Sequence, residues 1–88
     1  MNIEEANHII LKPYITEKTF ALVENESRIC FLVREEASKP KIVEAITLLY
    51  KENPLGVNVC RTVYGKKAFV KFQTVEIARD LATKIGML

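Results

Sequence analysis

The sequence predicts an α+β fold: a single compact domain in which helices pack on a mainly antiparallel sheet of three to four strands. Apolar residues alternate along some segments and recur at helical spacing in others, so both kinds of element are expected. One tight turn separates the last two alternating segments, and this hairpin excludes an all-parallel sheet. At 88 residues the chain has room for one core, so residues 1–88 are expected to form one domain. The strand order stays open between a ferredoxin-like split βαβ sheet and a variant with an added edge strand.

The N-terminal part is predicted to hold an extended segment and a short helix. Residues 8–11 are apolar and are expected to form a strand or an extended arm. Thr16 is a suitable N-cap for a helix over residues 17–24, because its hydroxyl can accept a hydrogen bond from a free N–H group of the first turn. Phe20 and Val23 are expected to face inward from that helix.

The middle of the chain predicts a central strand and the clearest helix. Residues 28–33, RICFLV, are apolar on both faces, which is typical of a strand covered by helices. Ser38 is expected to cap the following helix, with Pro40 in the first turn, where its missing N–H costs nothing. Residues 53–56, NPLG, end it. Apolar positions at helical spacing in this segment are Ile42, Ala45, Ile46, Leu49 and Tyr50.

The C-terminal part predicts a hairpin and a last helix. Residues 57–64 and 67–72 are expected to pair as antiparallel strands around a turn at Gly65. Thr74 is expected to cap the last helix, and Gly86 to end it. The inward row of that helix is Ile77, Leu81 and Ile85.

The charges are divided unevenly along the chain. Residues 1–36 carry four Lys and Arg against seven Asp and Glu, a balance of −3, whereas residues 37–88 carry nine against four, a balance of +5. A basic half on a small domain is typical of a face that binds phosphate groups, with an ordinary solvated surface as the alternative. The N-terminus, MNIEEANH, lacks the features of a signal peptide, and no apolar run approaches the ~18 residues that cross a bilayer, so a cytoplasmic protein is expected.

Metal and catalytic chemistry have little support in the sequence. Cys30 and Cys60 are far apart, and the single histidine, His8, does not complete a zinc site with them. Both cysteines are expected to be reduced and buried, with a disulfide between neighbouring strands as the alternative. One histidine, one aspartate and no catalytic motif leave no constellation for an enzyme. No cofactor or metal is expected.

The stretch GKKAFVKF, residues 65–72, ends in five residues that match the tail of the RNA-recognition-motif signature. Strand alternation places Lys67, Phe69 and Lys71 on the face opposite the core. A reader of single-stranded RNA needs aromatic rings at the positions of both Lys67 and Phe69. Lysine suits a phosphate better than a base, so contact with the RNA backbone is favoured over base stacking, and a solvated basic edge is the alternative. Phe69 is expected to join the core if helices cover both faces of the sheet.

Four ordered blocks resemble the family of the large-ribosomal-subunit protein L-twenty-three, over residues 8–86. The more specific parts are the P-x-(I/V)-(T/S)-E-K element and the K-K-A-aromatic-V strand. Bacterial members insert a long basic loop before that strand, whereas this chain turns at Gly65, and it also lacks the basic N-terminal extension of eukaryotic members. The short form resembles archaeal members. Residues that differ from the usual family pattern are Lys41, Val59 and Phe72. The blocks are KPYITEKT (12–19), ASKPKIVEAI (37–46), VNV (57–59) and KKAFVKF (66–72).

The resemblance implies a structural constituent of the large ribosomal subunit, bound to large-subunit rRNA near the exit of the polypeptide tunnel and beside neighbouring ribosomal proteins. It also implies a docking surface for the signal recognition particle, or for a chaperone, and it places Glu17 there. The alternative for Glu17 is a first-turn glutamate that the helix dipole favours, and for Thr16 a capping role alone. The rRNA-binding residues carried over from the motifs are Lys12, Thr16, Lys18, Lys39, Asn58, Lys66 and Lys67.

Two further functions are kept beside the ribosomal one. The first is a single-stranded-RNA-binding regulatory module of the RNA-recognition-motif type, which requires Phe69 to be exposed for stacking. The second is a protein-interaction module without RNA. In the ribosomal hypothesis Lys66 and Lys67 both grip phosphates, and replacing both by Glu is expected to weaken RNA binding with little loss of stability.

Overall fold

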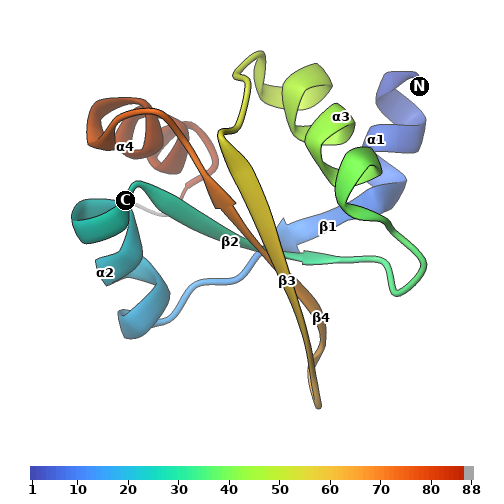
Figure 1. Cartoon of the computed structure of the whole chain (residues 1–88), viewed down its shortest axis with the longest axis horizontal. Coiled ribbons are helices and arrows are strands. Elements are labelled where there is room, and N and C mark those ends of the chain that lie inside the picture. The colour runs from blue at the N-terminus through green and yellow to red at the C-terminus, as the bar shows by residue number, and fades with distance from the viewer. Residues whose placement is uncertain (87–88) are drawn as a thin grey trace.

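Four antiparallel strands in the order β1–β2–β4–β3 form the centre of the fold, which a computed structural model describes for residues 1–86 (Figure 1). Four helices of this region pack around the sheet, so the predicted α+β class is confirmed. In chain order the elements are α1 (Ile3–Ile9), β1 (Ile10–Pro13), α2 (Glu17–Glu26), β2 (Arg28–Val33), α3 (Lys39–Tyr50), β3 (Gly56–Thr62), β4 (Gly65–Lys71) and α4 (Val75–Lys84).

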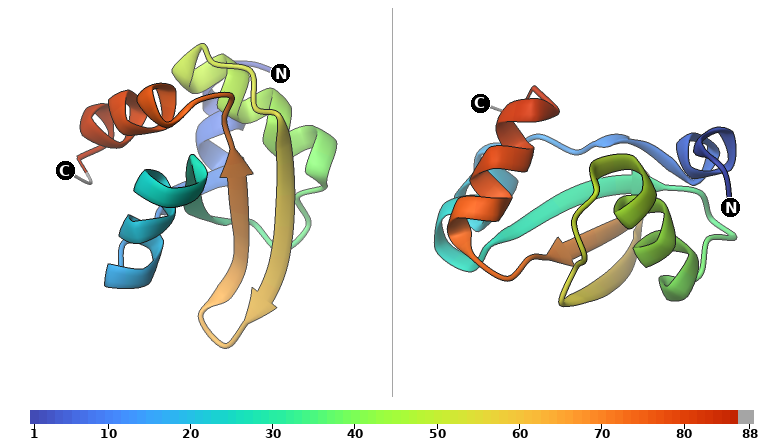
Figure 2. Two further views of the ribbon diagram at one scale, coloured as in Figure 1. Left: turned by 60° about the vertical axis from the view of Figure 1, so that its left-hand side comes forward. Right: turned by 90° about the horizontal axis from the view of Figure 1, so that it is seen from above.

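The sheet combines a split βαβ unit with an added edge strand. β2 and β3 both run antiparallel to β4, so they are parallel to each other, and α3 connects them while β4 lies between them. β1 pairs antiparallel with the free side of β2. The sheet therefore matches the second of the two arrangements that the sequence left open, the variant with an added edge strand. Figure 2 shows the β3–β4 hairpin projecting beyond the helices.

One face of the sheet, the core face, is covered by apolar packing. Its buried strand residues come from alternate positions, as the pleat of a strand requires. The ring of Tyr50 on α3 stacks on that of Phe31 with 5.9 Å between centroids. Burial of each large apolar side chain contributes roughly 1.5–3 kcal/mol to folding. The buried residues of the core face are Ile29, Phe31 and Val33 on β2, and Ala68 and Val70 on β4.

The helices form two pairs, α1 with α3 and α2 with α4, which lie to either side of the strands in Figure 1. In the second pair, Arg79 of α4 donates two hydrogen bonds to the Glu24 carboxylate of α2, at 3.3 and 2.7 Å. This guanidinium lowers the pKa of Glu24 because the hydrogen bonds favour the charged carboxylate. The bidentate contact fixes the register of one helix on the other.

Helix α1 differs from the expected extended arm. Its N-cap is Asn2, whose side-chain oxygen accepts a hydrogen bond from the Glu5 N–H at 2.8 Å. Glu4 and Glu5 in the first turn suit the positive end of the helix dipole, and Ala6 is fully buried. The expected strand is confined to β1, which begins at Ile10.

Helix α2 begins at the predicted cap but presents a different stripe to the sheet. The side chain of Thr16 accepts from the Thr19 N–H, and the Thr19 hydroxyl accepts from the Thr16 N–H, which makes a reciprocal capping box. The inward position predicted for Val23 is confirmed, whereas the prediction for Phe20 is wrong, because Phe20 is 38% exposed. Thr19 is buried in its place, since its hydroxyl donates to the Tyr14 carbonyl at 2.9 Å.

The two cysteines lie in different environments. Cys30 is buried on β2 and Cys60 is exposed on β3, so the expectation of burial holds only for Cys30. β4 separates their strands, and two strand spacings of about 4.8 Å each exceed the ~7 Å that a disulfide spans between Cα atoms. Both thiols are therefore free, and burial raises the pKa of Cys30 to about 11, an effect that the nearby Lys67 partly offsets.

This contrast predicts the reactivity of the two thiols. We expect an aromatic disulfide reagent at pH 8 to modify Cys60 rapidly in the native protein, because Cys60 is exposed, whereas burial both shields Cys30 and raises its pKa. Cys30 is expected to react only after unfolding in denaturant. The released chromophore should therefore correspond to one thiol per chain in buffer and two in denaturant. Modification of both at the same rate in buffer would contradict the burial of Cys30.

Candidate nucleic-acid interface

The sheet face opposite the core carries a group of cationic side chains and is named here the basic face. Strand register places Lys12 of β1 beside Leu32 of β2, and Leu32 beside Lys67 of β4, so the two lysines lie on the same face. Arg28 of β2 is directly opposite Lys71 of β4 and belongs to that face as well. The basic face is defined by these four cations: Lys12, Arg28, Lys67 and Lys71.

Positive charge on this face is only partly compensated. Among residues 1–86, its one ion pair joins Arg28 to Glu26 at 3.8 Å. The Nε atom of Arg28 is buried and has no hydrogen-bond partner among residues 1–86. Like charges directly opposite each other in a sheet destabilise it, so the Arg28–Lys71 pairing has a cost in the isolated protein. A bound anion would offset that cost.

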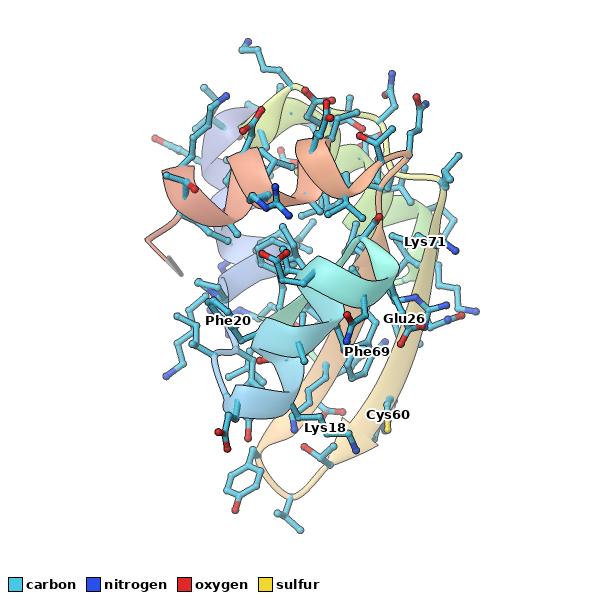
Figure 3. All side chains as sticks on the ribbon, turned by 90° about the vertical axis from the view of Figure 1, so that its left-hand side faces the viewer. Lys18, Phe20, Glu26, Cys60, Phe69 and Lys71 are labelled. Carbon is cyan, nitrogen blue, oxygen red and sulfur yellow. The ribbon has the colours of Figure 1, made fainter. Side chains whose placement is uncertain are left out.

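Between these cations, the residues of the basic face become more exposed from β2 through β4 to β3. Cys30 on β2 is buried, Phe69 on β4 is half-buried, and Asn58 on β3 is exposed, although the three are cross-strand neighbours. Figure 3 shows α2 in front of this face, with Phe69 at its flank and Lys18 at the end of the helix nearest the hairpin. The half of the face formed by β3 and β4 is therefore the accessible part.

Lys67 is held in place by aromatic rings. Its Nζ lies 3.8 Å from the centroid of the Tyr14 ring and 5.6 Å from that of Tyr64. The backbone of Tyr14 is fixed from two sides, because its N–H donates to the Cys30 carbonyl and its carbonyl accepts from the Thr19 hydroxyl, both at 2.9 Å. A cation–π contact orients an ammonium and directs an N–H at the ring, but it leaves the other donors of the ammonium available. Lys67 thus presents an oriented cation on the basic face.

Lys66 has a different environment from its neighbour. It lies on the other side of the strand, opposite Val33 and Arg61, and it is half-buried. Its ammonium donates hydrogen bonds to the carbonyls of Ala37, at 2.6 Å, and Glu35, at 3.3 Å. These contacts tie the hairpin to the loop that precedes α3. The expectation that Lys66 and Lys67 act as one phosphate-binding pair is therefore not supported by their placement.

The other predicted rRNA-binding residues outside the cap of α2 differ in their positions. Lys18 and Asn58 accompany Lys12 and Lys67 at the basic face. Lys39 does not, because it is the first residue of α3, the helix that packs on the core face.

Thr16 and Glu17 lie at the beginning of α2. Thr16 caps that helix through its hydroxyl, and Glu17 is the exposed first residue after the cap. No three His, Cys, Asp or Glu side chains of residues 1–86 gather as a metal site requires.

Sequence reasoning missed Arg28, Tyr14 and Tyr64 as members of this surface. Arg28 opens an apolar strand and gave no signal of its own, but the alternation of RICFLV placed it on the face of Cys30. Tyr14 and Tyr64 lie fifty residues apart, in a loop and a turn, and no periodicity links them to Lys67. Tyr14, Tyr64 and Lys67 come together only because β1 pairs with β2 and β2 pairs with β4.

The hydrogen bonds of Lys66 generate a stability prediction. Lys66→Met keeps the aliphatic stem but removes the bonds to two carbonyls, so we expect a loss of about 1–3 kcal/mol in the free energy of unfolding. Urea denaturation measures it. The control is Lys71→Met on the same strand, where the exposed lysine has no hydrogen bond to residues 1–86. It should cause no loss in the free energy of unfolding, because it also removes the repulsion from Arg28. Equal effects of the two substitutions would show that the carbonyl contacts do not stabilise the hairpin.

Known proteins resemble this chain over most of its length. The family model "Ribosomal protein L23" matches residues 8–84. The chain is 41% identical to the large ribosomal subunit protein uL23 of Methanobrevibacter smithii, over 90% of this chain and 93% of that protein. It is 36% identical to the proteins of the same name from Methanosphaera stadtmanae, with the same shares covered, and from Methanococcus vannielii, over 94% and 98%. The chain belongs to the ribosomal protein L23 family.

Proposed function

We propose that the chain is a structural protein of the large ribosomal subunit in the cytoplasm and that it binds large-subunit rRNA through the basic face, near the exit of the polypeptide tunnel. Membership in the ribosomal protein L23 family supports the ribosomal assignment. The basic face supports the mode of binding, because the pairing of the strands gathers four cationic side chains on one side of the sheet. No catalytic activity is part of this proposal.

The observation that carries the RNA contact is the set of four cations on one sheet face with a single ion pair among residues 1–86. Folded RNA presents dense negative charge, and neutralisation of its phosphates releases counterions, which favours binding. Lys12, Lys67 and Asn58 of the predicted rRNA-binding set contribute to this face, and Lys18 flanks it. Thr16 and Lys66 are assigned structural roles instead, since their polar groups bond to the protein backbone.

A second surface concerns factors that meet the nascent chain. In the family resemblance Glu17 belongs to the surface on which the signal recognition particle or a chaperone docks, and we propose that role for it here. Glu17 is exposed, and Ile15, on the other side of the Thr16 cap, is 51% exposed. An exposed apolar side chain and an exposed carboxylate on either side of this cap offer a partner both burial and an ion pair. Neighbouring ribosomal proteins are further proposed partners.

The regulatory alternative receives less support from the same surface. An RNA-recognition motif stacks bases on aromatic rings of two adjacent strands. Phe69 has Cys30 and Asn58 as its cross-strand neighbours, so the second ring is missing beside it. Phosphate contact by the surrounding cations is the mode that this arrangement favours.

The proposal predicts a loss of phosphate contacts when basic-face lysines are neutralised. We expect Lys12→Gln with Lys67→Gln to weaken binding to folded large-subunit rRNA and to reduce the slope of log affinity against log salt by about one unit per lysine. Large-subunit rRNA transcribed in vitro and folded with Mg²⁺ is the probe, and filter binding across a salt series gives the slope. The unfolding midpoint of each variant is measured in parallel.

The matched control removes the same charge elsewhere. Lys51→Gln with Lys84→Gln neutralises two exposed lysines, at the C-cap of α3 and in the last turn of α4, and it should leave the slope unchanged. An equal reduction in both double variants would mean that net charge alone governs binding. Equal or tighter binding of the wild-type protein to unstructured RNA of the same length would favour the regulatory alternative.

A further inference from the structure

The tip of the β3–β4 hairpin exposes large apolar side chains. The turn places Val63 and Tyr64 at 94% and 71% exposure. Gly65 adopts a φ of +120°, and the hydroxyl of Thr62 both donates to the Gly65 carbonyl at 2.9 Å and accepts from the Tyr64 N–H at 3.2 Å. These bonds hold the turn without help from the core. A turn held in this way needs less ordering of its backbone when a partner binds, which favours binding there.

Tyr64 lies beside the oriented cation of the basic face. The Tyr64 ring is 6.5 Å from the Tyr14 ring, at an interplanar angle of 34°, and the ammonium of Lys67 is near both. Tyr14 is half-buried and forms the inner side of this group, whereas Tyr64 is mostly exposed. No hydrogen bond or ion pair within residues 1–86 engages the Lys67 ammonium. The group therefore offers an open aromatic face next to a cation whose hydrogen-bond donors are available.

From this juxtaposition we propose that the hairpin tip is a subsite for one unpaired RNA base, which stacks on the Tyr64 ring while Lys67 binds an adjacent phosphate. The inference rests on the proposed rRNA-binding function and adds to it a specific feature of the RNA. Every nucleotide combines a flat π-system with an anionic group, and the subsite combines an exposed ring with a cation. Stacking and charge thus both match one ligand.

The geometry selects an unpaired base over a paired one. In an A-form helix the bases are stacked on one another, and side chains cannot read the deep, narrow major groove. A bulge or loop presents a base that is splayed out and free to stack on tyrosine. Tyr64 belongs to the turn of the β3–β4 hairpin, which projects beyond the helices (Figure 2), and its side chain is 71% exposed, so a splayed-out base can approach it from solvent. Tyr14, the other ring of this group, is half-buried, so Tyr64 alone offers a stacking surface and the site accepts a single base.

The test compares three substitutions at Tyr64 on the full chain. Tyr64→Leu keeps apolar bulk but removes the π-system, and we expect it to weaken binding to folded large-subunit rRNA by about 5- to 150-fold. Tyr64→Phe keeps the ring and should bind within about 2-fold of the wild-type protein, since stacking needs no hydroxyl. Tyr64→Trp presents a larger ring and should bind at least as tightly. Val63→Ala is the matched control at the same turn and should have no effect.

The salt dependence separates stacking from charge. Tyr64→Leu should leave the slope of log affinity against log salt unchanged, whereas Lys67→Gln should reduce it by about one unit. Unfolding midpoints check that the exposed substitutions leave the fold intact. If the wild-type protein binds tightly with a steep slope and Tyr64→Leu binds equally well, the base subsite is refuted while the proposed rRNA binding stands. If the wild-type protein fails to bind the rRNA at low salt, both are refuted.

Discussion

The two-residue alternation of β4 is the constraint on which the core and the basic face both depend. β4 lies between β2 and β3, so its pairing sets the register of the sheet. Ala68 and Val70 enter the core, and Lys67 and Lys71 are therefore on the opposite face. A shift by one residue would exchange the two sets and bury ammonium groups without partners, which costs several kcal/mol. The packing that stabilises the fold thus also fixes where the cations lie.

The segment between β1 and α2 connects this sheet to its surface chemistry. Thr19 completes the capping box of α2 and also bonds to the carbonyl of Tyr14, so the start of the helix and the end of the edge strand are held together. Tyr14 in turn orients Lys67 through its ring. A single buried threonine therefore contributes to helix initiation, to strand docking and, through Tyr14, to the position of a cation.

Local signals made most elements predictable, whereas contacts between distant segments were not. The caps at Thr16 and Thr74 and the alternation of RICFLV depend on neighbouring residues, and the structure has them at those positions. Helix α1 had an Asn cap and early glutamates as signals, but the short apolar run after it favoured an extended arm. Strand alternation separated Lys67 from Ala68 correctly. It did not reveal that the ammonium of Lys66 bonds to carbonyls of a loop thirty residues earlier, because a strand pattern holds no information on its partner loop.

The like charges of the basic face lower the stability of a small domain that has little stability to spare. A domain of this size buries only about 60–70% of its unfolded surface, so its stability margin is small. The opposition of Arg28 and Lys71 reduces that margin further in the isolated chain. A polyanion that binds the folded state and not the unfolded state adds its binding free energy to stability. In the proposed complex with RNA, phosphates beside these cations would replace their repulsion with attraction, so fold stability and RNA binding would be linked through the same four side chains.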